Sequence, residues 1–252
     1  MKRNQKAKDK AYSLAANSKL TGVDFAKATK WASQIYAPLK LHEKHLCKRS
    51  VFQNLSKLLV EVYHSDKKNA LGAKKLSAGN VDKLTKWRLS PYSAWQDRLG
   101  IKIGLTTAPT TGKASVSVAK FELPAHRFVE RARQMAMRFY IYQLNEDNEQ
   151  LTLEATDNLL ADFDVTHQEV TADFEFPPLS NGVLLLVGVA QLYLATPNQQ
   201  EIFASFDRLY YQANLMQALA IRNGKPVLYH KIETTAPKEV SIAKVAWQRK
   251  SL

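Results

Sequence analysis

Gly182-Val-Leu-Leu-Leu-Val-Gly-Val-Ala-Gln-Leu-Tyr-Leu194 contains the longest apolar run of the chain. The uninterrupted part, Val183 to Ala190, is well short of the roughly 20 residues that a membrane-spanning helix needs. Aliphatic and β-branched residues in such a run are typical of a strand that is covered on both faces. The sequence therefore predicts a central, fully buried strand here.

The segments on either side of this strand also have the pattern of strands. Downstream, 213–221 and 227–232 are joined by Arg222-Asn223-Gly224-Lys225, and Asn-Gly accepts the positive φ angles of a tight hairpin turn. Upstream, 135–144 is rich in aromatic residues and is followed by the polar turn 145–148. Shorter alternating segments occur at 116–121, 151–153 and 170–176. This spacing predicts an antiparallel β-sandwich of the Ig-like or jelly-roll type.

Before about residue 100 the apolar residues recur at helical spacing. Thr21 and Asp24 have the spacing of a capping box, which predicts a helix from Thr21 to about Tyr36, ending before Pro38. A longer amphipathic helix with a basic face is expected from Leu39 to about His64, and a third, short one from 81 to 87.

Charge divides the chain in the same way. Residues 1–102 carry 22 Lys and Arg against 7 Asp and Glu, whereas residues 103–252 carry 14 against 16. We therefore predict an α+β protein with a basic arm at 1–20, a basic helical region at 21–100 and a β-sandwich domain at 101–252, the last forming an independent body.

The layout of residues 114–222 resembles an uncharacterised bacterial family whose members pair a basic helical N-terminal region with an Ig-like β domain. The resemblance lies in Val118-Ala119-Lys120-Phe121-Glu122-Leu123-Pro124, in Arg138-Phe139-Tyr140-Ile141-Tyr142 and in Leu184-Leu185-Leu186-Val187-Gly188-Val189. These are packing and turn features, so the resemblance implies the architecture and no functional residue.

Sequence signatures of catalysis are missing. Thr110-Thr111-Gly112-Lys113 lacks the upstream glycine of a phosphate-binding loop, and neither Gly-x-Gly-x-x-Gly nor Gly-x-Ser-x-Gly occurs. The single cysteine, Cys47, excludes an intramolecular disulfide and a Cys-rich zinc site. His42 and His45 could share a helix face, but Cys47 points elsewhere. We therefore expect a protein that is not an enzyme and has no cofactor and no metal site.

Two further groups of residues have both a functional and a structural interpretation. Three acidic loop residues could hold a cation, but they lack the glycine and the bidentate acid of a calcium loop, which favours solvated turn carboxylates. Three aromatic residues among lysines and arginines could stack on single-stranded bases, although packing at the junction is the simpler interpretation. The groups are Asp157, Asp162 and Asp164, and Trp87, Tyr92 and Trp95.

The basic helical region has the clearest functional signal. Of the 22 basic residues in 1–102, 18 are Lys, which acts as a point charge on phosphates, whereas readout of base edges favours Arg. Any nucleic-acid binding should therefore be weakly sequence-specific. The candidate polyanion-binding residues are Lys40, Lys44, Lys48, Arg49, Lys57, Lys67, Lys68, Lys74 and Lys75.

Three functions remain open at this level. The first is a structural, assembly or partner-docking module that binds a protein partner or copies of itself. The second is a non-sequence-specific nucleic-acid-binding protein that uses the basic helical half. The third, an enzyme acting on carbohydrate in a sandwich cleft, is motivated by the fold class alone. Without a signal peptide or an apolar span we expect a cytoplasmic protein that uses no membrane, with a virion, phage-like particle or mobile element as the alternative setting.

Overall fold

The computed structural model describes residues 15–90, 99–125, 128–198, 200–207 and 210–229. Tyr92, Trp95, most of the predicted arm and the end of the predicted hairpin lie outside these residues.

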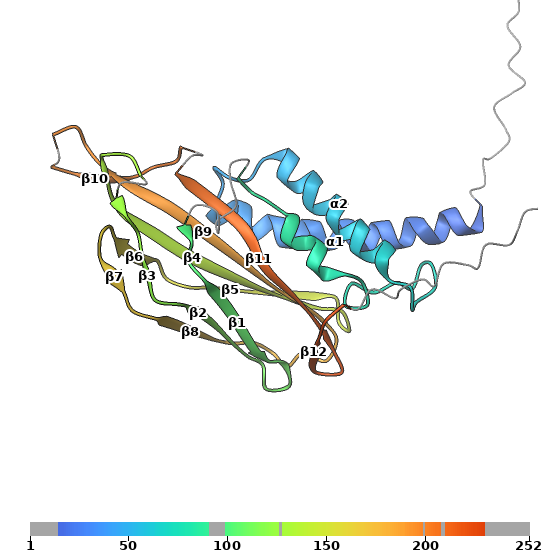
Figure 1. The fold of residues 1–252 in the computed structure, drawn as a ribbon. Coiled ribbons are helices and arrows are strands. Elements are labelled where there is room, and N and C mark those ends of the chain that lie inside the picture. Colours follow the sequence, from blue (N-terminus) through green and yellow to red (C-terminus); the bar gives the residue numbers. More distant parts are fainter. Residues whose placement is uncertain (1–14, 91–98, 126–127, 199, 208–209, 230–252) are drawn as a thin grey trace, which may run out of the picture.

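Three layers are stacked on one another (Figure 1). Helices α1 (Ala16–His42) and α2 (Arg49–Ser65), with the short 3₁₀ helix η1 (Val81–Lys86), form the helical layer. The middle layer is a seven-stranded sheet, and the third is a sheet of three strands. The strands are β1 Ile103–Ala108, β2 Lys113–Val118, β3 Phe121–Glu122, β4 Ala132–Asn145, β5 Gln150–Ala155, β6 Leu159–Asp162, β7 Thr166–His167, β8 Val170–Glu175, β9 Gly182–Ala195, β10 Ile202–Ala204, β11 Tyr211–Arg222 and β12 Lys225–Val227.

The middle sheet has the order β12-β11-β9-β4-β5, with β10 paired to β9 and β6 to β4, and all of its pairings are antiparallel. On β9, Val183, Leu185 and Val187 face the helices. Leu186 and Leu192 on the same strand face the small sheet β1-β2-β8. The predicted central strand, buried on both faces, is therefore confirmed, and so is the α+β sandwich class.

The tight hairpin between β11 and β12 is also confirmed. Asn223 and Gly224 have φ angles of 49° and 71°, as a turn of this length requires. Asp162, one of the three residues interpreted as acidic loop residues, lies instead at the end of β6, Leu159–Asp162. Only one of the four residues of this strand, Ala161, is buried, so its sequence carries almost no strand pattern.

The helix boundaries differ from the predicted ones. Helix α1 begins before Thr21, whose hydroxyl donates to the Asn17 carbonyl within the helix and caps nothing. The helix also continues through Pro38, because the burial of Ile35 and Leu39 on either side outweighs the lost backbone hydrogen bond. The chain then turns at 43–48, so α2 begins ten residues later than predicted.

The helical layer and the middle sheet share one hydrophobic core. Leu55 and Trp87 pack in the same cluster as Tyr142 and Leu185. The backbone of the segment after η1 also pairs with β11, with Leu89 N–H donating to the Ala213 carbonyl. The expected boundary at residue 100 separates regions of different secondary structure, but the prediction of an independent β body is wrong. In the part of the chain that the structure describes, no helix is long and apolar enough to cross a membrane.

Candidate functional site

Most acidic residues of the helical region are buried, and most of its basic residues are exposed. Residues 15–90 contain 15 Lys and Arg but 5 Asp and Glu. Three of the five carboxylates, those of Asp24, Asp66 and Glu43, are 1–4% exposed. Across the described ranges only two ion pairs occur, Lys30 with Glu149 and Arg138 with Glu43. The outer surface of this layer is therefore positive and almost free of neutralising pairs.

One group of cations surrounds the turn between the two helices. This turn cluster consists of Lys40, Lys44, Lys48 and Arg49, all of which are exposed. The turn places them beside the N-terminus of α2. No acidic residue occurs in the first turn of that helix, and the Lys48 side chain does not cap it. The positive end of the helix dipole therefore adds to the four side-chain charges.

A second group, the loop cluster, lies at the other end of α2. It consists of Lys67, Lys68, Lys74 and Lys75, of which Lys74 is half-buried and the others are exposed. The seventeen residues of α2 separate the two clusters by about 24 Å. Lys57, on α2 between them, is also exposed.

Buried carboxylates hold the loop cluster in place. Asp66 accepts hydrogen bonds from the backbone N–H groups of Lys68, Asn69 and Lys75 at 2.9–3.2 Å. Asp24 accepts from the Gly72 N–H at 2.8 Å. Burial alone would raise the pKa of Asp66, but these hydrogen bonds outweigh it and lower the pKa. The carboxylates thus organise the backbone and leave the lysine ammonium groups free to face solvent.

A pocket of about 330 Å³ opens within the turn cluster. Its floor consists of Leu46, Val51 and Leu89, and its polar wall of side chains that can all donate hydrogen bonds. The polar residues are His45, Lys48, Ser50, Asn54, Arg88 and Ser90.

Glu43 lies between the helical layer and the sheet, next to this pocket in sequence. Its carboxylate accepts hydrogen bonds from Tyr140 OH, at 2.5 Å, and from Tyr211 OH, and Arg138 Nη1 lies 3.7 Å away. Burial raises the pKa of Glu43, against the opposing effects of the Tyr140 hydrogen bond and the Arg138 charge. Every oxygen of this carboxylate is satisfied, so the group joins the layers rather than presenting a reactive acid.

The nine predicted polyanion-binding residues therefore form two separate clusters, with Lys57 between them. The structure adds Ser90, and it brings Arg88, one of the basic residues around the candidate aromatic platform, next to the turn cluster. Nothing in their local sequence shows that the segment 87–90 lies against β11 beside the start of α2. The burial of Asp24 had a signal, because this residue lies one turn before Ala28 on the buried stripe of α1.

At Trp87 the structure favours the simpler interpretation, packing at the junction, over a stacking platform. The Trp87 side chain is fully buried and donates from Nε1 to the Val51 carbonyl, so no base can stack on it. The structure also separates the histidines: His42 lies against Tyr140, and His45 against Phe206 with ring centroids 4.2 Å apart. Within the described ranges, no group of three or more His, Cys, Asp or Glu has metal-binding geometry.

The contacts of Cys47 and of two of the three acidic residues, Asp162 and Asp164, indicate structural roles. Burial, with the nearby Glu43 carboxylate, raises the pKa of the Cys47 thiol to about 11, which keeps it protonated at neutral pH. Asp162 accepts a hydrogen bond from the Gln134 side chain, and Asp164 accepts one from the Ala125 N–H.

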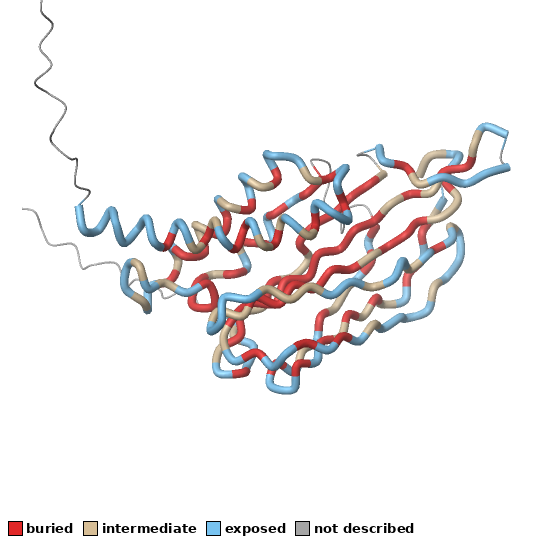
Figure 2. Tube along the Cα trace, turned by 180° about the vertical axis from the view of Figure 1, so that it is seen from behind, coloured by how far each residue is buried: buried red, intermediate tan, exposed pale blue. Residues whose placement is uncertain are grey.

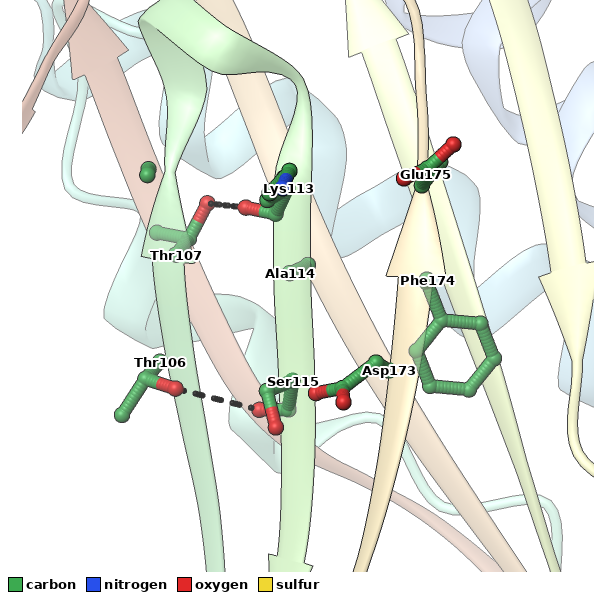
Figure 3. Close-up of a pocket in the computed structure, with 9 residues that line it drawn as sticks. Thr106, Thr107, Lys113, Ala114, Ser115, Asp173, Phe174 and Glu175 are labelled. Atoms are coloured by element: carbon green, nitrogen blue, oxygen red, sulfur yellow. Dashed lines mark hydrogen bonds between the residues drawn. The ribbon is translucent and has the colours of Figure 1, made fainter.

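A larger, open groove of about 530 Å³ lies on the outer face of the small sheet (Figure 3). The hydroxyls of Thr106 and Thr107 donate to backbone carbonyls of β2. Asp173 and Glu175 lie two residues apart on β8, in register with Ser115 and Lys113 of β2. This face is short-chained and polar and carries charges of both signs.

No family model and no curated protein matches this chain. Among solved structures, a protein assigned as ApaA from Bordetella pertussis is 8% identical, with a TM-score of 0.25, and covers 48% of this chain and 92% of its own. A superoxide reductase (neelaredoxin) from Ignicoccus hospitalis is 13% identical, with a TM-score of 0.22, and covers 46% of this chain and 77% of its own. Similarity at this level supports no inference about function.

Proposed function

We propose that this protein binds polyanions, with nucleic acid as the target, through the basic surface of its helical layer. The observation behind the proposal is the distribution of charge by burial: three of the five carboxylates in residues 15–90 are buried, whereas most of the 15 basic residues are exposed. Only Lys30 among these cations forms an ion pair within the described ranges. Unpaired lysines on a rigid surface displace counterions from phosphates, which is the main source of non-specific affinity.

The spacing of the two clusters suits an extended ligand. Over about 24 Å, duplex DNA presents on the order of 14 phosphate charges, so one strand of phosphates can run from the turn cluster to the loop cluster. Lys supplies most of this charge, so binding is indifferent to sequence.

The test is the salt dependence of binding to mixed-sequence DNA and RNA. Replacing Lys67, Lys68, Lys74 and Lys75 together by Gln should reduce the log–log salt slope on duplex DNA by up to about 3.6, or about 0.9 per lost contact. The matched control replaces four exposed lysines elsewhere by Gln, namely Lys102, Lys113, Lys120 and Lys225. Wild-type binding that is absent at low salt, or a slope that falls equally in both variants, contradicts the proposal.

A role in assembly is the second candidate, and the start of α1 favours it. Residues 15–23 are all exposed, and this end of the helix extends beyond the sheet (Figure 2). It carries Leu20 and Val23, 42% and 43% exposed, and Phe25 follows at 57%. Light scattering after size exclusion tests this function. Self-association that Leu20→Ser together with Val23→Ser abolishes would support it, and a monomer at high micromolar concentration would contradict it.

A further inference from the structure

We propose that the pocket at the start of α2 is a binding site for a single phosphate group. The first observation is its charge: Lys48 and Arg88 line it together with His45, and none of the described residues that line it is acidic. Its volume of about 330 Å³ falls within the range of about 300–1,000 Å³ that is usual for small-molecule sites.

The second observation is the backbone at the helix start. The N–H groups of Val51 and Phe52 donate to the Lys48 carbonyl. Among the described residues, no acceptor is present for the N–H groups of Arg49 and Ser50. Free N–H groups at the N-terminus of a helix, aligned with its dipole, are a recurring phosphate site.

The third observation is independent of the helix. Ser90 is 1% exposed, and its hydroxyl has no hydrogen-bond partner in the described part of the chain. A buried hydroxyl without a partner costs free energy, and this one belongs to a residue of the pocket wall. An oxyanion seated in the pocket would supply the missing acceptor.

Tetrahedral phosphate fits this donor set better than a carboxylate does. Donors come from two directions: the start of α2 on one side, and Arg88 and Ser90 of the segment beside β11 on the other. Four oxygens can use donors from both sides, and the guanidinium can bind two of them in bidentate fashion. The assignment rests on the proposed function only where the phosphate belongs to a nucleic acid. It is independent of that function where the phosphate is free or part of a small phosphomonoester.

The test titrates full-length protein with inorganic phosphate, then with a nucleoside monophosphate, then with a short oligothymidylate, while backbone amide resonances are followed by NMR. Saturable shifts at Arg49 and Ser50 are expected. Ser90→Ala and Arg88→Gln should each weaken phosphate binding by about tenfold, because each removes a donor to a charged group. The matched control is Lys120→Gln, an exposed lysine outside both the pocket and the helical layer, which should change affinity less than about twofold.

The outcomes separate the two proposals. Binding of inorganic phosphate without binding of the oligonucleotide supports the phosphate site and contradicts the proposed function. Oligonucleotide binding that leaves Arg49 and Ser50 unshifted, with no response to phosphate, contradicts the phosphate site and leaves the proposed function standing. Equal affinities for all three variants also overturn the phosphate site. If Ser90→Ala does not fold, the exposed Arg88→Gln decides.

Discussion

The two layers that cover the middle sheet differ in how their charged side chains are distributed. The small sheet β1-β2-β8 places Lys113 beside Glu175 and Ser115 beside Asp173, so charges of both signs share its outer face. The helical layer buries Asp24, Glu43 and Asp66 and exposes its lysines. A surface on which acidic and basic side chains are mixed is neutral without a partner. Where the acidic side chains are buried and the basic ones exposed, the exterior keeps a positive charge that nothing in the layer compensates. The comparison therefore points to the helical layer as the side that meets an anionic partner.

The largest expected effect comes from breaking the contact between the helical layer and the sheet. Trp87→Ala removes a fully buried side chain and its hydrogen bond to the Val51 carbonyl. We expect a loss of about 3–5 kcal/mol in the free energy of unfolding, measured by denaturant titration. Because the core is shared, both layers should unfold together. A retained native signal from the sheet after the helices melt would show that they are independent.

The next effect concerns the scaffold of the loop cluster. Asp66→Asn removes one carboxylate oxygen from a group that accepts three backbone N–H bonds, and we expect a loss of about 1.5–3 kcal/mol. The pKa of Asp66 is lowered in the folded state, so its stabilising contribution is complete above its ordinary value of 3.8 and is lost as pH falls through the lowered pKa. The difference in the free energy of unfolding between wild type and Asp66→Asn should therefore shrink as pH falls. A difference that grows in acid would contradict this.

Glu43→Gln should have a smaller effect with the opposite dependence on pH. Burial raises the pKa of Glu43. The stabilisation that Glu43 contributes is therefore complete below its ordinary pKa of 4.5 and is lost as pH rises through the raised pKa. Near neutral pH the neutral amide avoids the cost of a buried charge, so we expect a net change below about 1.5 kcal/mol. The stability of the variant relative to wild type should increase as pH rises above 4.5. Denaturant titrations across this range measure it, and a constant difference would contradict the assignment.

The smallest effect is expected on the outer face of the small sheet. Ser115→Ala lies in the open groove of Figure 3 and should change the free energy of unfolding by less than about 0.5 kcal/mol. It should leave polyanion affinity unchanged. A large loss of polyanion affinity in this variant would show that the small sheet, and not the helical layer, carries the binding surface.

Sequence patterns predicted the strands better than the helices. The apolar run of β9 and the Asn223-Gly224 turn are local signals, and the structure confirms both. Pro38 is also a local signal, but burial of Ile35 and Leu39 overrides it. Tertiary packing decides such cases, and local sequence does not encode it.

The lysines of the candidate site could be predicted from the sequence, but the pocket could not. Composition and spacing identified the lysines of both clusters, because net charge is additive along the sequence. The pocket depends on the segment 87–90 lying between α2 and β11, a contact between residues distant in sequence. Ser90 as a residue of the pocket wall could be identified only from the structure.

The pairing of Leu89 with Ala213 and of Trp87 with Leu215 bears on how this chain can be cut. A fragment beginning at residue 101 would lose the segment that protects this flank of β11, together with the helices over an apolar sheet face. Open strand edges beside exposed apolar surface recruit other chains and aggregate. The sandwich is thus not a portable module, and gene fusions or domain swaps that keep it must carry the helices along.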